Sequence, residues 1–453
     1  MAGITLRQAA QWCGGRVEEK YAQIVFTGAN IDSRKILPGQ LFIALQGERD
    51  GHDYIPMAVE KGAAAVLCSR PCGDIPAILV DDPRRALGDI ARQERKRIGM
   101  QVVGVTGSVG KSTTKEMIAA VLSGTYRVEK TPVNQNNDLG MPMAILAMPE
   151  DTQVAVLEMG MNHFREIAYL TSIALPNVAV IINVGTMHIE HLGSREGILQ
   201  AKMEILEGLQ ENGKAIFNGD DALLWNQRNL KKLQLTYFGE QNPQCAVRAC
   251  HVQAGEQGLS FQVQAGELAF PVQMDLEGNH FVSDALAAVS VGLEMGVTPE
   301  NIQTSLAHFR NIAGRQEIFE AKGYTIIKDC YNAGPESMQA ALEVLGRREG
   351  RHIAILGDML ELGSCTPAEH YRVGRIAAEK AEILLAYGPN GCRTISGALT
   401  GGMGEAKAMS FEDGGQLVST LKRIAKPGDV ILFKGSRGMH MELLLEQFLA
   451  EET

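Results

Sequence analysis

The feature that most constrains the fold is the segment GVTGSVGKSTTKEM, residues 104–117, a glycine-rich turn between an apolar strand and an amphipathic helix. Backbone N–H groups of such a turn point into one concavity, and the start of the helix adds positive potential. Lys111 supplies a mobile positive charge, and the Ser112 hydroxyl can bind Mg²⁺. Although Val105 stands where the full GxxxxGK[ST] pattern has its first glycine, the segment predicts an α/β unit that binds a nucleoside triphosphate.

Short apolar strands alternate with helices after this segment, which is typical of a parallel sheet covered on both faces. We predict strands at residues 102–106, 154–158, 178–183 and 215–218, with helices at 111–122 and 197–209. Between residues 245 and 276 apolar and polar side chains alternate, which predicts an antiparallel patch with one solvated face. Helices follow from His280 and from Pro299, with Thr298 as the N-cap.

A second α/β run begins near Gly314, with strands predicted at residues 325–328, 352–356, 383–386 and 430–434. It predicts a Rossmann-like, doubly wound domain of about 140 residues. A chain of 453 residues is too long for one core, and the three units expected are residues 1–98, a small α/β domain, 99–313, the nucleotide-binding domain, and 314–453. The change of unit predicts a hinge at Gly314.

Composition excludes several classes of partner. The formal net charge is −10 and the one short basic run, residues 92–97, is predicted to be a solvated helix face, so neither nucleic acid nor an anionic membrane is expected. Eight scattered cysteines without CxxC spacing indicate a reducing compartment. The N-terminus lacks an apolar signal region and no run of about 18 apolar residues occurs, so we predict a cytoplasmic protein and a monomer.

Three further residues are candidates for chemistry beside the phosphate turn. Glu158 ends a predicted parallel strand, where a carboxylate can hold Mg²⁺, although an exposed acid at a strand end is the alternative. His188 follows the next strand, yet an imidazole is an unusual ligand for a hard ion and a structural role is the alternative. Lys202 on its own is interpreted as a solvated helix lysine paired with Glu204 or Glu207.

Motifs along essentially the whole chain resemble the Mur ligase family, the ATP-dependent amide ligases of peptidoglycan precursor synthesis. The resembling segments are TGSVGKSTTKE, NQNNDLGMP, LEMG, NVGTMHIEHLGSREGILQAKMEIL, NIAGRQE, DCYNAGPESM, ILGDMLELG and VILFKGSRGMH. DCYNAGPESM and GDMLELG resemble the branch that joins D-alanyl-D-alanine to UDP-N-acetylmuramoyl-tripeptide. The sibling that adds the third amino acid carries DNPR in its C-terminal domain, whereas the similar string here, DDPR, lies at residues 81–84.

The resemblance implies the residues of the site. Lys111, Lys202, His188 and Arg315 would be catalytic; Ser112, Glu158, His188 and Lys202, the last as a carbamate, would bind Mg²⁺. ATP would contact Gly107, Ser108, Val109, Gly110, Lys111, Ser112, Thr113, His280, Tyr331 and Asn332. The substrates would contact Asp32, Ser33 and Arg34 at the UDP end, Asn134, Asn136 and Asn137 in the asparagine loop, and Lys434, Ser436 and Arg437 at the dipeptide carboxylate. Asp284 stands where the family pattern has Asn.

Some interpretations stay open on sequence alone. Without the resemblance, residues 134–137 are equally a turn, and residues 32–34 equally a capped turn with a solvated arginine. The alternative functions are the third-residue sibling, a folate polyglutamate ligase, and an ATP-binding regulatory protein that retains only the phosphate turn.

Overall fold

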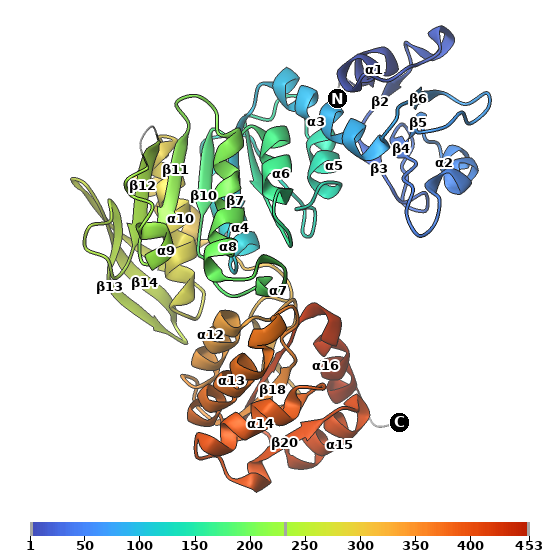
Figure 1. The fold of residues 1–453 in the computed structure, drawn as a ribbon. Coiled ribbons are helices and arrows are strands. Elements are labelled where there is room, and N and C mark those ends of the chain that lie inside the picture. Colours follow the sequence, from blue (N-terminus) through green and yellow to red (C-terminus); the bar gives the residue numbers. More distant parts are fainter. Residues whose placement is uncertain (1–2, 231–232, 451–453) are drawn as a thin grey trace.

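The computed structural model describes residues 3–230 and 233–450 and has three domains, each built on its own sheet (Figure 1). The small N-terminal sheet is parallel, in the order β3-β4-β5-β6, with strands Ala29–Asn30, Leu41–Ile43, Ala65–Cys68 and Ala77–Leu79. A short antiparallel pair, β1 (Ile4–Thr5) and β2 (Val25–Phe26), lies beside it. Its helices are α1 (Leu6–Cys13), α2 (Ile55–Glu60) and α3 (Pro83–Ile98).

The central domain is a nine-stranded sheet, in the order β15-β14-β13-β12-β11-β10-β7-β9-β8. Neighbouring strands are parallel from β8 to β13, and β13, β14 and β15 continue the same sheet as an antiparallel meander, so the predicted patch is confirmed. The strands are β7 (Gln101–Thr106), β8 (Val128–Lys130), β9 (Val154–Glu158), β10 (Val178–Ile181), β11 (Lys214–Asn218), β12 (Gln234–Gly239), β13 (Val247–Gly255), β14 (Gly258–Ala265) and β15 (Leu268–Met274).

Helices cover both faces of this sheet because its central strands are apolar on both sides. Val103 and Val105 of β7 pack with α4 and α10, whereas Val102 lies in the core that contains α3, α5 and α6. The helices of the domain are α4 (Lys111–Ser123), α5 (Gly140–Ala147), α6 (Glu166–Ala174), α7 (Ile189–Leu192), α8 (Arg195–Met203), α9 (Ala222–Trp225), α10 (His280–Glu294) and α11 (Pro299–Ala307).

The predicted helix over residues 197–209 is wrong in its second half. Helix α8 ends at Met203, and residues Glu204–Gly208 form a tighter 3₁₀ turn. The reason is that the Glu204 carboxylate accepts hydrogen bonds from the backbone N–H groups of Arg165, at 2.8 Å, and Ala168, at 3.1 Å, at the start of α6. This contact ties the turn to the neighbouring helix instead of letting α8 continue.

The C-terminal domain is a six-stranded sheet in the order β16-β17-β21-β18-β19-β20, parallel except for β16. Helices α12, α13 and α14 cover one face, and α15 and α16 cover the other. The elements are β16 (Glu317–Ala321), β17 (Tyr324–Asp329), α12 (Pro335–Leu345), β18 (Arg351–Gly357), α13 (Thr366–Lys380), β19 (Ile383–Tyr387), α14 (Gly391–Thr400), β20 (Ala408–Phe411), α15 (Gly414–Ile424), β21 (Asp429–Lys434) and α16 (Met441–Leu449). The predicted three-domain α/β fold is confirmed.

Helix α3 belongs to two cores at once. Asp82 caps its start by accepting from the N–H groups of Arg84 and Arg85, and its apolar side packs both on α1 and on α5 and α6. Arg95, from the basic run predicted to be solvated, is only 9% exposed and donates to the carbonyl oxygens of Ala174 and Leu175, both at 2.9 Å. The arginine therefore caps α6, and the domain boundary predicted at residue 98 falls at the end of a shared helix.

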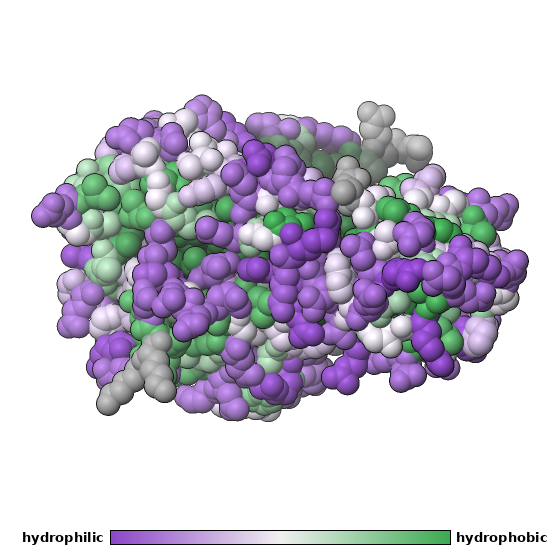
Figure 2. Space-filling model, turned by 90° about the horizontal axis from the view of Figure 1, so that it is seen from above, coloured by the Kyte–Doolittle hydropathy of each residue, from purple (hydrophilic) through white to green (hydrophobic). Residues whose placement is uncertain are grey.

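The face seen in Figure 2 is mostly hydrophilic, with hydrophobic side chains in small areas between charged ones. Among the residues the structure describes, no helix combines the length and the apolar character needed to cross a membrane.

Close packing of α13 on α14 generates a stability prediction. A methyl group on Gly374 would lie 1.9 Å from the Thr394 carbonyl oxygen, which belongs to backbone that cannot move aside. Gly374→Ala should destabilise the C-terminal domain by about 1–3 kcal/mol, measured by chemical denaturation. Gly404→Ala is the control, because nothing lies within 4 Å of the added carbon. Equal denaturation midpoints for the two variants would contradict this packing.

Candidate active site

The phosphate turn leads from β7 into α4, as the sequence predicts. Gly110, with φ of +84°, is the N-cap of α4, and Lys111 is the first residue of the helix. The Lys111 ammonium donates to the carbonyl oxygens of Gly107, at 2.8 Å, and Ser108, at 3.2 Å. Its pKa is lowered by burial and, to a smaller extent, by the charge of Arg315, while Glu158 opposes the shift. The ammonium is thus held over the turn.

Asn183, two residues after the end of β10, binds the phosphate turn through its side chain. Its side-chain oxygen accepts from the N–H groups of Ser108, at 2.9 Å, and Val109, at 3.0 Å, and its amide donates to the Val109 carbonyl oxygen, at 3.0 Å. We did not single out Asn183 from the sequence. Its place directly after a parallel strand, where ligand-facing residues gather, is the signal that could have found it.

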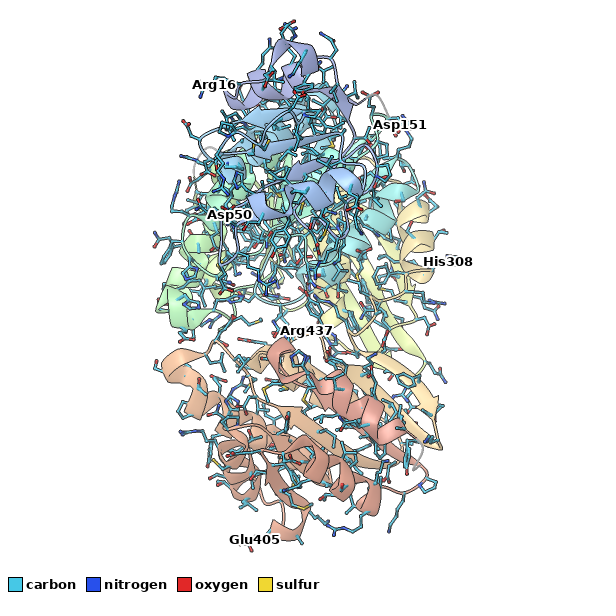
Figure 3. All side chains as sticks on the ribbon, turned by 90° about the vertical axis from the view of Figure 1, so that its right-hand side faces the viewer. Arg16, Asp50, Asp151, His308, Glu405 and Arg437 are labelled. Atoms are coloured by element: carbon cyan, nitrogen blue, oxygen red, sulfur yellow. The ribbon has the colours of Figure 1, made fainter. Side chains whose placement is uncertain are left out.

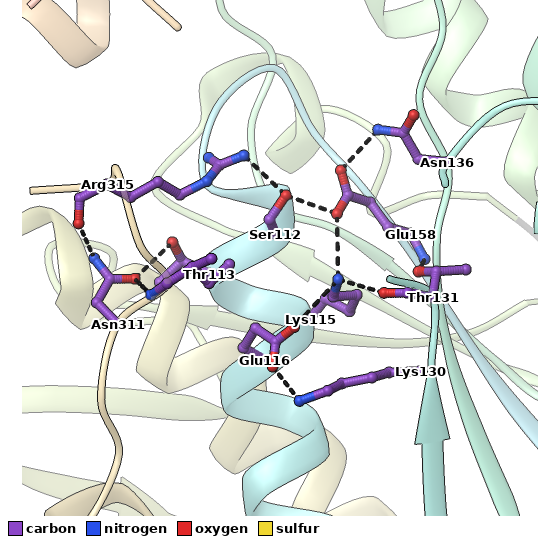
Figure 4. A network of polar contacts seen from close by, with 11 residues as sticks. Ser112, Thr113, Lys115, Glu116, Lys130, Thr131, Asn136, Glu158, Asn311 and Arg315 are labelled. Carbon is purple, nitrogen blue, oxygen red and sulfur yellow. Dashed lines mark hydrogen bonds and ion pairs between the residues drawn. The ribbon is translucent and has the colours of Figure 1, made fainter. Parts of the chain in front are cut away.

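Four predicted residues meet at the Glu158 carboxylate (Figure 4). Glu158 is 3% exposed; one of its oxygens accepts from the Ser112 hydroxyl, at 2.7 Å, and the other from the Asn136 amide, at 2.9 Å. Arg315 donates to the Ser112 oxygen, at 2.9 Å. The alternative of an exposed acid is therefore wrong, and the structure brings together residues from α4, β9, the asparagine loop and the interdomain linker.

A buried lysine missed by the sequence reasoning lies behind this carboxylate. Lys115 is 0% exposed; its Nζ donates to the Thr131 carbonyl oxygen, at 2.6 Å, and lies 3.3 Å from Glu116 and 3.9 Å from Glu158. The Thr131 hydroxyl also accepts from the Glu158 N–H, at 3.0 Å. Lys115 and Thr131 therefore fix the position of Glu158 from the protein side (Figure 4).

Lys202 is buried, which makes the interpretation of a solvated lysine wrong. It is 1% exposed, and no hydrogen bond or ion pair reaches its amine from residues 3–230 or 233–450. Burial, and secondarily the charge of Lys111, lower its pKa well below the usual value. The residues Ile198, Ala201 and Ile205, at helical spacing from Lys202, are also buried, so the apolar stripe was the available signal.

His188 lies between the central and C-terminal domains. Its backbone is in the left-handed region, with φ of +63°, and its Nδ1 lies 2.6 Å from the Glu361 carboxylate of the C-terminal domain. The hydrogen bond with His188 lowers the pKa of Glu361, and burial opposes this shift. Among the described residues, no group of three or more His, Cys, Asp or Glu side chains could hold a metal ion. The predicted metal ligands include only two residues of these types, Glu158 and His188.

A cavity of about 1020 Å³ lies between the central and C-terminal domains and collects most of the predicted nucleotide residues. The predicted residues that line it are Ser108, Val109, Gly110, Lys111, Ser112, Thr113, Asn136, Asn137, Glu158, His188, His280, Arg315, Tyr331, Asn332 and Lys434. Within it the Arg315 guanidinium lies 4.0 Å from the Tyr331 ring centroid, and the Tyr331 hydroxyl contacts Asn134. The cavity therefore joins the phosphate turn to the C-terminal domain.

Sequence models of known families match nearly every part of this architecture. "Mur ligase family, catalytic domain" matches residues 25–95, "Mur ligase middle domain" residues 105–292, and "Mur ligase, glutamate ligase domain" residues 314–437. The chain belongs to the Mur ligase family.

Relatives named for one activity resemble this Mur ligase over its whole length. It is 39% identical over 456 residues to the UDP-N-acetylmuramoyl-tripeptide–D-alanyl-D-alanine ligase of Bacillus subtilis (strain 168), covering 98% of each chain. Identity to the enzyme of the same name from Escherichia coli (strain K12) is 36% over 450 residues, covering 98% and 97%.

Two solved structures share the fold of this Mur ligase. A crystal structure of MurF from Acinetobacter baumannii superposes with a TM-score of 0.91 at 32% identity, covering 99% of both chains. MurF ligase from Thermotoga maritima in complex with ADP superposes with a TM-score of 0.83 at 30% identity, covering 93% of this chain and 97% of that one.

The residues predicted for the UDP end lie apart from the cavity. Asp32 and Arg34 form a two-point ion pair, with both N–O distances 2.9 Å, which lowers the pKa of Asp32 to about 2. The Arg34 side chain is 78% exposed and Ser33 is buried against Met57. The arginine is thus accessible to an anion, at the loop between β3 and β4.

The residues predicted for the dipeptide carboxylate differ in accessibility. The Lys434 ammonium is buried and already paired with Asp329, at 2.5 Å, and Ser436 is buried, its hydroxyl accepting from the Leu360 N–H, at 2.9 Å. Arg437 has a side chain 64% exposed and lies at the edge of the C-terminal domain that faces the other two domains (Figure 3). Among these three, Arg437 is the residue most open to a ligand.

Asp284 lies under the phosphate turn of this Mur ligase. It is 5% exposed and accepts from the Thr114 hydroxyl, at 2.7 Å, and a methyl group on Gly110 would lie 2.6 Å from its oxygen. Burial raises the pKa of Asp284 to about 7, against which the Thr114 hydrogen bond and Arg315 act. The turn can approach this carboxyl only because residue 110 is a glycine.

Asp284→Asn should therefore stabilise the chain in a pH-dependent way. Between the ordinary pKa of 3.8 and the folded value of about 7, the unfolded chain releases a proton that the folded chain keeps, so stability falls as pH rises through this window. The Asn side chain does not titrate, so this loss of stability does not occur, and its amide oxygen can still accept from the Thr114 hydroxyl. We expect a gain of up to about 4 kcal/mol near pH 8 and little difference near pH 4, measured by denaturation. A variant less stable than the parent near pH 8 would contradict the assignment.

Proposed function

We propose that the chain joins D-alanyl-D-alanine to UDP-N-acetylmuramoyl-tripeptide, with ATP hydrolysed to ADP and phosphate. The observation that carries the proposal is the full-length similarity to relatives named for this activity. A cavity that holds a phosphate turn, a buried carboxylate and an arginine between two domains supports it. We infer further that the enzyme is a cytoplasmic monomer with no nucleic-acid or membrane partner, which the acidic composition and the scattered cysteines favour.

The chemistry begins with activation of a carboxylate. A tripeptide carboxylate oxygen attacks the γ-phosphorus of ATP, forming an acyl phosphate and releasing ADP. The amine of D-alanyl-D-alanine then attacks the acyl carbon, phosphate leaves, and the amine loses a proton as the amide forms. In this scheme Lys111 and Arg315 neutralise charge on the transferring group, because a planar, permanently charged guanidinium suits phosphoryl oxygens. The acyl phosphate must be kept from water, which a closed interdomain cavity favours.

The oxygen atoms around Ser112 fit a magnesium ion. The Ser112 hydroxyl and the Glu158 carboxylate lie 2.7 Å apart, both are hard oxygen donors, and Lys115 and Asn136 hold the carboxylate in place. When bound, Mg²⁺ would neutralise phosphate charge. His188 and a Lys202 carbamate complete the proposed ligand set. The same proposal includes ATP contacts at His280, Tyr331 and Asn332. It also includes contacts with the other substrates at Asp32, Ser33, Arg34, Asn134, Asn136, Asn137, Lys434, Ser436 and Arg437.

The decisive experiment measures phosphate release from ATP with UDP-N-acetylmuramoyl-tripeptide, with and without D-alanyl-D-alanine, and the mass of the product. We expect release only when both are present. Release supported by a single amino acid in place of D-alanyl-D-alanine would instead assign a sibling ligase. ATP binding without release under any condition would leave a regulatory ATP-binding protein.

Carbamylation of Lys202 has its own test. The buried amine with a lowered pKa is the neutral form that adds to the carbon of CO₂, losing a proton and gaining an anionic oxygen. Lys202→Ala should lose activity by about 10²-fold or more, and small carboxylates such as formate or acetate should restore part of it. Lys202→Arg, which cannot form the carbamate, is the control for volume and charge. Full activity of Lys202→Ala would end the idea.

A further inference from the structure

Residues 185–190 of the central domain lie between two segments of the C-terminal domain. The Glu336 carboxylate, in the first turn of α12, accepts from the Thr186 N–H, at 3.0 Å, and from the Thr186 hydroxyl, at 3.2 Å. On the other side, Glu361 pairs with His188. Because carboxylates accept hydrogen bonds more strongly than neutral groups, the Glu336 contact is a firm link between the two domains.

Glycines let these two surfaces approach. A methyl group on Gly185 would lie 2.9 Å from the Glu336 carboxylate, and one on Gly334 would lie 2.8 Å from Met187. On the far side, a methyl group on Gly363 would lie 3.1 Å from Glu190. A methyl group would displace the Glu336 carboxylate at Gly185 and the Met187 side chain at Gly334, so the contact as it stands includes glycines from both domains.

The same loop touches the phosphate turn. The Gly185 N–H donates to the Ser108 hydroxyl, at 2.9 Å, and Asn183, two residues earlier, holds the N–H groups of Ser108 and Val109. Two residues thus separate the Glu336 contact at Thr186 from the atoms that shape the turn. A displacement of residues 185–186 passes directly to Ser108.

We propose that Glu336 is a positioning residue that makes the geometry of the phosphate turn depend on the seating of the C-terminal domain. Glu336 fixes Thr186, the N–H of the neighbouring Gly185 bonds the Ser108 hydroxyl, and the turn takes its working shape only when α12 is in place. The inference rests on the proposed function, in which the C-terminal domain brings the attacking amine. Its consequence is that the acyl phosphate forms when the domain that consumes it is already docked.

Hydrogen exchange tests the link without any substrate. Glu336→Ala should raise the exchange rates of amides in residues 105–113 as well as 183–188, because Thr186 loses its partner and Ser108 loses its support. Glu343→Ala is the matched control: Glu343 lies on the same helix and bonds Gln339 within the C-terminal domain. Unchanged exchange in residues 105–113 of Glu336→Ala would overturn the proposal, whatever reaction the enzyme catalyses.

Kinetics supply the second readout. Glu336→Ala should lower kcat on the order of 10²-fold. The KM for the UDP-linked substrate should change less than about twofold, and the unfolding midpoint should stay the same. Glu336→Gln keeps an acceptor oxygen and should retain more activity than Glu336→Ala. Gly185→Ala should mimic Glu336→Ala, and the double variant should be no worse than either, because both remove one contact. Multiplicative losses would overturn the proposal. An inactive parent enzyme would instead reject the proposed function, and the hydrogen-exchange result alone would then decide whether Glu336 positions the phosphate turn.

Discussion

The buried Glu158 carboxylate organises the site, because side chains from α4 and from the asparagine loop bind it. A carboxylate at 3% exposure is costly unless its oxygens are bonded and a positive charge lies near. Ser112 and Asn136 supply the hydrogen bonds, and Lys115, itself fully buried, supplies the charge. The start of α4, the end of β9 and the asparagine loop are therefore held in register, and Arg315 extends this arrangement to the C-terminal domain through Ser112. Removal of the Glu158 carboxylate would take away the acceptor of both the Ser112 hydroxyl and the Asn136 amide.

The sequence predicted the elements that local patterns determine and missed those that depend on distant partners. Strands buried on both faces read as apolar runs, so β7, β9, β10 and β11 of the central sheet and β17, β18, β19 and β21 of the C-terminal sheet were correctly predicted. The short edge strands β8, β16 and β20 were not, because segments such as VEK and EIFEA have polar residues and no clear period. The break after α8 was missed because Glu204 binds α6, which lies more than thirty residues earlier.

Site residues divide in the same way. Lys111, Ser112 and Glu158 follow from motifs at strand ends, and the structure places them together. Asn183, Lys115 and Glu336 lie within quoted motifs, but no role was assigned to them, and their roles appear only when the strands, helices and domains are assembled. Lys202 is intermediate: the apolar residues Ile198 and Ile205, four before it and three after it, were an unused signal of burial, and the lysine was interpreted as solvated.

Helix α3 has a consequence for the size of substrate that the molecule can span. Its sixteen residues form a rod of about 24 Å, and its apolar side is shared between the N-terminal core and the core that holds α5 and α6. Helix α3 thus joins the domain whose β3–β4 loop carries Arg34 to the domain whose phosphate turn carries Lys111 through one continuous apolar core. A molecule bound at the loop of Arg34 would therefore present to the phosphate turn only the atom that lies at the matching distance along its own length.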